Sequence, residues 1–176
     1  MQDNITIRNV EINDAEAILR IYAHYINATA ITFECIVPSL DACRNRIEEF
    51  SKDYPYIVAL YKGEIVGYAY AHAYYGRDAF KWSVETSIYM DGQHRRKGAG
   101  RQLYTALEAR LKSEGFKNMY ACIASPLGDD PYLDEGSIAF HKKMGFHVCG
   151  HFNKCGYKFK KWYDVVWMEK IIGKHN

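Results

Sequence analysis

One stretch of the sequence places a carboxylate directly before an anion-binding turn. Residues 82–90 alternate in the manner of a strand and carry Glu85. The turn that follows is basic and rich in glycine, and it consists of Arg95, Arg96, Lys97, Gly98, Ala99, Gly100 and Arg101. Because a periodic helical segment begins there, unpaired backbone N–H groups and the helix dipole can hold a phosphate. The stretch therefore predicts an anion site and a candidate base on neighbouring elements.

The glycine turn alone does not identify the ligand. Leu103 stands where the third glycine of a dinucleotide fingerprint would fall, and no Gly-Lys-Ser/Thr sequence closes a Walker loop. A basic, exposed turn that merely caps a helix remains the alternative. The strand before the turn, the long helix and the strand after it favour a phosphate cradle.

Length and composition limit the remaining choices. The chain has 176 residues, which we interpret as one domain, 1–176. Its net charge of +2 argues against a nucleic-acid binder, and its apolar runs are too short to span a membrane. The polar start lacks the apolar core of a signal peptide, and five cysteines without a C-x-x-C pair favour the cytoplasm and no metal site.

Hydrophobic periodicity predicts the elements that position this stretch. Strands are expected at 5–10, 56–61, 65–73, 82–90, 119–124, 147–152 and 165–170. Helices are expected over the apolar positions of 15–26, 40–50, 103–111 and 137–144, with Ser39 and Gly115 as caps. Residues 125–136 have turn composition, and residues 153–164 are expected to connect two strands.

The order of these elements predicts the fold class. Consecutive strands in the first half imply antiparallel pairing, while strand–helix–strand over 82–124 requires a right-handed parallel crossover. We expect an α/β (α+β) fold with a mixed, mainly antiparallel twisted sheet, a central βαβ crossover and helices on both faces. Strand 65–73 alternates aromatic residues with glycine and alanine, so its small-residue face would let a helix pack closely.

Several segments together resemble a known family. Arg95-x-x-Gly98-x-Gly100 resembles the acyl-CoA pyrophosphate motif of the GNAT acetyltransferase superfamily. Segments 32–34, 84–90, 139–146 and 156–164 then look like the phosphinothricin acetyltransferase family, which includes N-acetyltransferases of methionine sulfoximine and methionine sulfone. The resemblance covers nearly the whole chain. It implies a GNAT fold, acetyl-CoA as co-substrate and direct attack by an amine.

The resemblance also implies two catalytic residues. Glu85 matches the family's proposed base, which takes a proton from the acceptor ammonium directly or through a water. His141 matches the family's histidine, at a place where many other GNAT enzymes carry a tyrosine acid, and it would protonate the leaving thiolate. The alternatives are a carboxylate facing solvent or an arginine, and a helix histidine held in a structural hydrogen bond.

Acetyl-CoA would be bound by main chain and by the glycine turn. In the superfamily the strand bulges and parts from its neighbour, so Ile88, Tyr89 and Met90 would bind the thioester carbonyl and pantetheine amides. Arg95 to Arg101 would hold the pyrophosphate, with charge added by Arg96 and Lys97. The family asparagine is missing from residues 125–136, so Asp134 is the nearest substitute, and Ser137 follows it.

An amino-acid acceptor would need a cation and an apolar wall. The resemblance points to Arg77 for the carboxylate, to Phe33 and Phe80 for the wall, and to Glu34 for the shape of the pocket. Other amines remain alternatives, namely a peptide N-terminus, a polyamine or an antibiotic, as does a catalytically silent acyl-CoA-binding module. The family is typically dimeric, so a homodimer is expected.

Overall fold

The computed structural model of the chain describes residues 5–94 and 98–175. These residues form seven strands: β1 (Ile5–Asn9), β2 (Tyr56–Tyr61), β3 (Glu64–Ala73), β4 (Ser83–Met90), β5 (Asn118–Ser125), β6 (His147–Lys158) and β7 (Lys161–Ile171). The α-helices are α1 (Ala15–Ala28), α2 (Leu40–Asp53), α3 (Ala99–Ser113) and α4 (Gly136–Lys143). Short 3-10 turns are η1 (Ile12–Asp14), η2 (Asp78–Phe80) and η3 (Gly92–His94).

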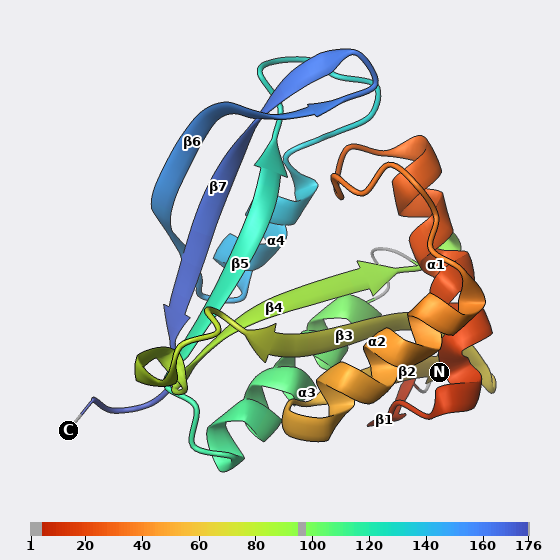
Figure 1. Cartoon of the computed structure of the whole chain (residues 1–176), viewed down its shortest axis with the longest axis vertical. Coiled ribbons are helices and arrows are strands. Elements are labelled where there is room, and N and C mark those ends of the chain that lie inside the picture. Colours follow the sequence, from red (N-terminus) through yellow and green to blue (C-terminus); the bar gives the residue numbers. More distant parts are fainter. Residues whose placement is uncertain (1–4, 95–97, 176) are drawn as a thin grey trace.

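The strands form one mixed sheet in the order β1-β2-β3-β4-β5-β7-β6. Among the described strands, β4 and β5 are the parallel pair, and α3 connects them; all other neighbours are antiparallel. The predicted α/β fold with a central βαβ crossover is confirmed. Figure 1 shows β4 running across the middle of the molecule while β5 rises away from it.

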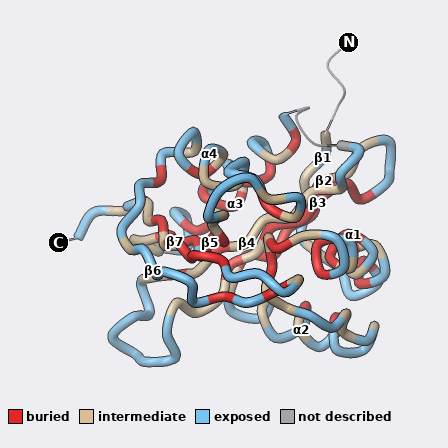
Figure 2. Tube along the Cα trace, turned by 90° about the horizontal axis from the view of Figure 1, so that it is seen from above, coloured by how far each residue is buried: buried red, intermediate tan, exposed pale blue. Residues whose placement is uncertain are grey.

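Helices cover both faces of the sheet, as predicted. Figure 2 shows the strands between α3 and α4 on one side and α1 and α2 on the other. Ala69 and Ala71 are fully buried in the α3 cluster, whereas Tyr68 belongs to the cluster with α1 and α2. The alternation along β3 therefore places small residues under α3, where its fully buried leucines 103, 107 and 111 pack.

The β6–β7 hairpin corrects one prediction. Residues 153–164 were expected to form a connection, but β6 continues to Lys158 and β7 begins at Lys161. β6 is an outer strand whose residues are mostly exposed, so it lacks the alternation of buried positions that identifies a strand. Register shifts between Phe152 and Gly156 interrupt its pattern further.

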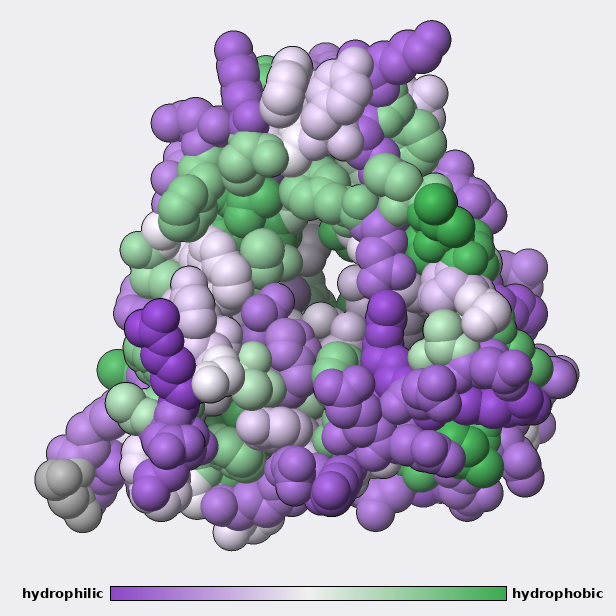
Figure 3. All heavy atoms as spheres, in the orientation of Figure 1, coloured by the Kyte–Doolittle hydropathy of each residue, from purple (hydrophilic) through white to green (hydrophobic). Residues whose placement is uncertain are grey.

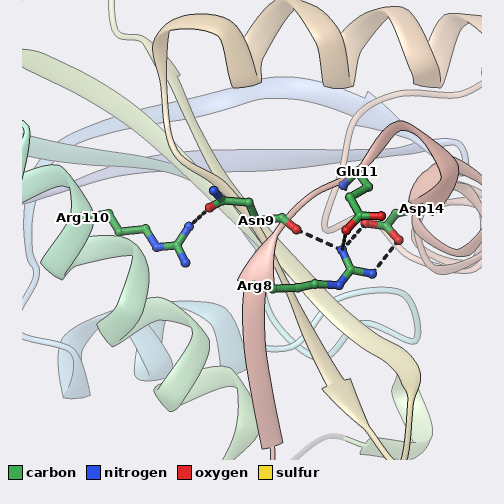
Figure 4. Close-up of polar contacts among 5 residues, drawn as sticks. All are labelled: Arg8, Asn9, Glu11, Asp14 and Arg110. Atoms are coloured by element: carbon green, nitrogen blue, oxygen red, sulfur yellow. Dashed lines mark hydrogen bonds and ion pairs between the residues drawn. The ribbon is translucent and has the colours of Figure 1, made fainter.

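A polar cluster fastens the N-terminal strand to the helices on both faces (Figure 4). The Arg8 guanidinium donates to both carboxylate oxygens of Asp14, at 2.6 and 2.8 Å, and so ties β1 to the start of α1. Arg110 of α3 donates to the side chain of Asn9 at the end of the same strand. In the described part of the chain, no helix is long and apolar enough to cross a membrane.

Candidate active site

The site begins where β4 leaves β5. Their pairing covers only Ser83–Glu85 of β4 and Asn118–Tyr120 of β5, after which β5 stays with β7 to Ser125. β4 meanwhile remains paired with β3 up to Met90. The predicted parting of the strands is therefore present, whereas the expected bulge is not, because the β3–β4 register is continuous. Figure 3 shows an opening through the molecule where Figure 1 has these strands diverging.

We call the pocket between the diverging strands the β4–β5 cleft. It is lined by Ile31, Thr86, Ser87, Ile88, Tyr89, Ala121, Cys122, Ile123, Ala124, Leu133, Ser137 and His141. Four of these, Ile88, Tyr89, Ser137 and His141, are predicted site residues. Sequence reasoning missed the contribution of β5 and of Leu133. The strand pattern predicted β5, but no feature of its local sequence indicated that the middle of β5 would be unpaired on the side of β4.

The main chain of β4 presents different groups to its two sides. The N–H of Asp91 donates to the carbonyl of Val66, and backbone groups alternate along an antiparallel pair. Tyr89 therefore hydrogen-bonds to β3, while Ile88 and Met90 point away from it. The N–H of Met90 donates to the Tyr25 hydroxyl, which donates in turn to the Met90 carbonyl. Ile88, Tyr89 and Met90 were expected to bind the cofactor through main chain. Of these three, Ile88 is the residue whose backbone groups are directed toward the cleft.

Glu85 is the last residue of β4 that pairs with β5, directly before the two strands part. Its side chain is largely buried, and it shares a face of β4 with Ser87 and Tyr89, although it does not itself line the pocket. Burial raises the pKa of the Glu85 carboxyl, and a partly opposing effect of His72 leaves the net shift upward. A carboxylate with a raised pKa binds a proton more strongly than an ordinary one.

His141 approaches the cleft from α4, on the other side of the sheet. It is 4% exposed, and Nδ1 lies 2.8 Å from the carbonyl oxygen of Ser137. A carbonyl only accepts, so Nδ1 carries the proton and Nε2 is left with a lone pair. Burial lowers the pKa of His141, which keeps the ring neutral near pH 7. The two predicted catalytic residues therefore reach the gap from opposite faces.

Thr86 and Tyr104 form a buried hydrogen-bonded wall on the α3 side. The Thr86 hydroxyl donates to the Tyr120 carbonyl at 3.0 Å, so the Tyr104 hydroxyl donates to Thr86, at 2.7 Å. The Tyr104 ring also meets His141 edge-on, with centroids 5.3 Å apart. This contact holds the histidine ring against a fixed surface.

The glycine turn is described only in part. Arg95, Arg96 and Lys97 lie outside the described residues. Gly98 is the N-cap of α3 with φ of 82°, a left-handed conformation that glycine adopts without strain. Having no side chain, it leaves the first-turn N–H groups of α3 without a cap of its own. Ala99 is buried and Arg101 is exposed. The uncapped N–H groups in the first turn of α3 are the feature that an anion site needs.

The predicted acceptor residues lie outside the lining of the cleft. Arg77 and Phe80 are exposed on the connection between β3 and β4. Glu34 forms an ion pair with Arg46, at 3.0 Å. Phe33 packs directly on Gly156, where a Cβ would collide with its ring. Asp134, which was expected to contact the cofactor, is also outside this lining and accepts from the N–H of Gly136 at the start of α4.

Comparison with known proteins decides the family. A family model described as an acetyltransferase (GNAT) domain matches residues 7–167. The chain belongs to the GNAT acetyltransferase family. It is an acyl-CoA-dependent N-acetyltransferase, and acetyl-CoA is its co-substrate, as the sequence resemblance predicted.

Two relatives and one solved structure are similar to this chain over most of its length. Phosphinothricin N-acetyltransferase of Streptomyces viridochromogenes is 31% identical, over 94% of this chain and 87% of its own. The L-methionine sulfoximine/L-methionine sulfone acetyltransferase of Pseudomonas aeruginosa is 32% identical, over 93% and 92%. A crystal structure of a GNAT superfamily phosphinothricin acetyltransferase from Sinorhizobium meliloti, in complex with AcCoA, has a TM-score of 0.89 at 32% identity and covers 98% of this chain and 90% of its own.

The described residues of this GNAT chain fit acetyl-CoA. An open cleft, the backbone groups of Ile88 directed toward it and the glycine N-cap of α3 provide a path for an extended, anionic molecule. The thioester needs no metal for aminolysis. Within the ranges the structure describes, no three histidine, cysteine or acidic side chains are grouped to hold a metal ion.

Proposed function

We propose that this GNAT chain, as a single domain over 1–176, acetylates the α-amine of a small amino acid of the phosphinothricin, methionine sulfoximine or methionine sulfone type. The names of its relatives support this class of acceptor. The observation that carries the proposal is Glu85, a largely buried carboxylate with a raised pKa where β4 leaves β5. An amino-acid ammonium needs a base of this kind before its nitrogen can attack.

The proposed reaction uses Glu85 first. When bound, acetyl-CoA supplies the acetyl group as a thioester. Glu85 removes one proton from the acceptor ammonium, directly or through a water, and the freed nitrogen attacks the thioester carbon. The N–H of Ile88 is the proposed donor to the carbonyl oxygen. Arg95 to Arg101 and the first turn of α3 are the proposed pyrophosphate site, with Asp134 and Ser137 at the start of α4 beside the pantetheine.

His141 is the proposed group beside the leaving sulfur. Because its resting ring is neutral, Nε2 must first accept a proton, and the second proton lost by the attacking nitrogen can supply it. His141 then passes that proton to the CoA thiolate. Of the two protons that the nitrogen loses, one is therefore taken up by Glu85 and one leaves on the thiol. Since a free thiol titrates near about 8.5, this protonation aids departure without being indispensable.

Acceptor binding is assigned to residues of two connections, the one between β3 and β4 and the one between α1 and α2. Arg77 remains our proposed partner for the carboxylate, since it lies on the connection that leads into β4 and could form a bidentate pair. Phe33, Glu34 and Phe80 are proposed to shape the pocket. Acetylation of a peptide, a polyamine or an antibiotic is the alternative.

A thiol-release assay with acetyl-CoA tests the acceptor class. Free amino acids, with methionine sulfone, methionine sulfoximine and phosphinothricin among them, would be compared with polyamines and short peptides. We expect CoA release with at least one of the free amino acids. Release with polyamines or peptides and with none of the amino acids would overturn the proposal.

We also propose that the chain works as a cytoplasmic homodimer. All five cysteines are free, which suits a reducing compartment. The β6–β7 hairpin exposes Phe152, Tyr157 and Trp162, each by just over half of its surface. Three large exposed rings on an outer pair of strands favour a protein interface there.

A further inference from the structure

His72 on β3 lies beside the proposed base, Glu85, on the neighbouring strand β4. It is directly opposite Glu85 in the β3–β4 register, so both side chains project from the same face. Nε2 of His72 lies 3.9 Å from Oε2 of Glu85. The other side of the imidazole is stacked on Phe50 of α2, with centroids 5.2 Å apart and planes at 20°. The ring is therefore held by both its strand and a helix.

The hydrogen bond at the other ring nitrogen sets the tautomer. Nδ1 of His72 lies 3.1 Å from the carbonyl oxygen of Ala73, which can only accept. Nδ1 therefore carries the proton, and Nε2 toward Glu85 has a lone pair when the ring is neutral. A carboxylate and a lone pair repel each other unless one proton lies between them. At 3.9 Å the two groups lie just beyond direct hydrogen-bonding distance, so a proton passes between them after a small side-chain rotation or through one water.

We propose that His72 is a positioning residue of the acetyl transfer and the exit for the proton that Glu85 removes. The step balances: Glu85 takes one proton from the acceptor ammonium and gives it to Nε2 of His72, so the carboxylate is restored and the imidazole becomes a cation. The side chain of His72 is 27% exposed and can return the proton to solvent. This inference rests on the proposed role of Glu85 and adds a second group to it.

The other ionisable side chains around Glu85 and His72 are poor proton acceptors. They are Tyr70 on β3, Tyr74 beyond it, Tyr120 and Cys122 on β5, and Arg46 on α2. Burial raises the pKa of Tyr70 and of Cys122 to about 12. The pKa values of Tyr74 and Tyr120 are also raised by burial, and Arg46 is paired with Glu34. Among the described residues near the pair, none of these side chains therefore competes with Glu85 and His72 for the proton.

The test is the pH profile of kcat/KM for whichever amine gives the most thiol release, at saturating acetyl-CoA. In the wild type, a protonated His72 lowers the pKa of Glu85 and opposes the effect of burial. His72→Gln removes that charge, so the acidic limb should move to higher pH, and kcat near pH 7 should fall about 10-fold. His72→Ala should show the same defect and regain activity when imidazole is added.

His147→Gln is the matched control. His147 pairs with Glu169 at 2.9 Å on the outer strands, so the same substitution breaks a similar pair away from β4. Its pH profile should match the wild type. A wild-type acidic limb in folded His72→Gln, with no response of His72→Ala to imidazole, would overturn the role of His72.

Glu85→Gln separates the two levels of the argument. If that variant is nearly inactive while both His72 variants behave as wild type, the base stands and only the inference about His72 fails. If Glu85→Gln keeps full activity, the proposed base fails, and the role of His72 fails with it.

Discussion

At the scale of single residues, burial adjusts the two candidate catalytic groups in opposite directions. It raises the pKa of the Glu85 carboxyl and lowers the pKa of His141. Both shifts favour the neutral form of the group, since low polarity penalises charge. The consequence for chemistry differs between the two groups: Glu85 binds a proton more tightly, whereas His141 binds one less tightly but is neutral near pH 7 and so has Nε2 free to receive one.

Glu85→Gln keeps the shape of the side chain and removes its basicity. We expect kcat to fall by about 10²-fold or more, the usual cost of losing a general base. The KM for acetyl-CoA should change little, because Glu85 lies outside the lining of the cleft. Steady-state kinetics at neutral pH measure both quantities, and unchanged turnover would remove Glu85 from the mechanism.

Arg77→Ala addresses acceptor recognition. If Arg77 binds the acceptor carboxylate, its loss should raise the KM for amino acids by roughly 10-fold or more, as expected for a charge-assisted hydrogen bond. The affinity for acetyl-CoA, measured by titration without acceptor, should stay the same. A weaker affinity for acetyl-CoA with an unchanged amino-acid KM would assign Arg77 to the cofactor instead.

The lowered pKa of His141 makes a prediction about stability. Its pKa is lower in the folded chain than in the unfolded one, so the unfolded state binds more protons over that range. The stabilisation is fully present above about pH 6.5 and is lost as the pH falls through the folded pKa. The melting temperature of the wild type should therefore drop on acidification, and that of His141→Gln should drop less. Parallel melting curves for the two proteins would contradict this.

At the scale of elements, β4 combines two different edges. Toward β3 its hydrogen bonding is continuous, and toward β5 it covers three residues. The first edge fixes the register that sets His72 opposite Glu85, and the second leaves the backbone groups of Ile88 toward the cleft. A strand paired on both sides along its whole length would have no free backbone N–H or C=O groups for a substrate.

The junction of β1 with α1 can be tested apart from the cleft (Figure 4). Burial raises the pKa of Asp14, but the hydrogen bonds from Arg8 and from the Glu11 N–H lower it further, so the net shift is downward. Asp14→Asn should reduce the free energy of unfolding at pH 7 by about 1–3 kcal/mol. Since a depressed carboxyl pKa gives its full stabilisation above the unfolded pKa and loses it as the pH falls through the folded pKa, the difference should fade below about pH 4.

Denaturant titrations of Asp14→Asn at pH 7 and at pH 3 measure this difference. Asp41→Asn is a suitable control, because Asp41 pairs with Arg44 at the exposed surface of α2. Its effect should be at most about 0.5 kcal/mol. Equal losses of stability at both pH values in Asp14→Asn would show that the ion pair is not responsible.

At the scale of the whole molecule, the two candidate catalytic residues lie on opposite faces of the sheet, beside the β4–β5 cleft. Glu85 lies on the face covered by α1 and α2, and His141 reaches the cleft from α4 on the other face. The connection between α1 and α2 spans toward the β6–β7 hairpin, where the buried Lys158 donates to the carbonyl of Thr32, at 2.8 Å. The acceptor and the thioester can therefore enter from different sides and meet at β4.

The proposed homodimer is also a property of the whole molecule. Phe152→Glu and Trp162→Glu place charges on the exposed hairpin and should shift the protein toward monomer in sedimentation velocity runs. Ile36→Glu changes another exposed apolar residue, outside the hairpin, and should leave the assembly as it is. A wild type that sediments as a monomer at high concentration would contradict the proposal.

Local pattern was sufficient for much of this protein. The alternation in 65–73 correctly predicted that the small-residue face of β3 would let a helix pack closely, because side-chain direction in a strand depends on the backbone alone. The leucines of α3 and the Ser39 cap of α2 were readable for the same reason, and the Ser39 hydroxyl does accept from the Ala42 N–H. The GNAT family itself was recognisable from short sequence motifs.

Only the tertiary structure decided how far each strand stays with its neighbour. Three features depend on the register between two separate strands: the parting of β4 from β5 after Glu85, the full length of the β6–β7 hairpin and the position of His72 opposite Glu85. Sequence periodicity gives the face on which a side chain lies but not its partner across the sheet. The candidate base could therefore be named from the sequence, whereas its proton partner appeared only when β3 and β4 were aligned.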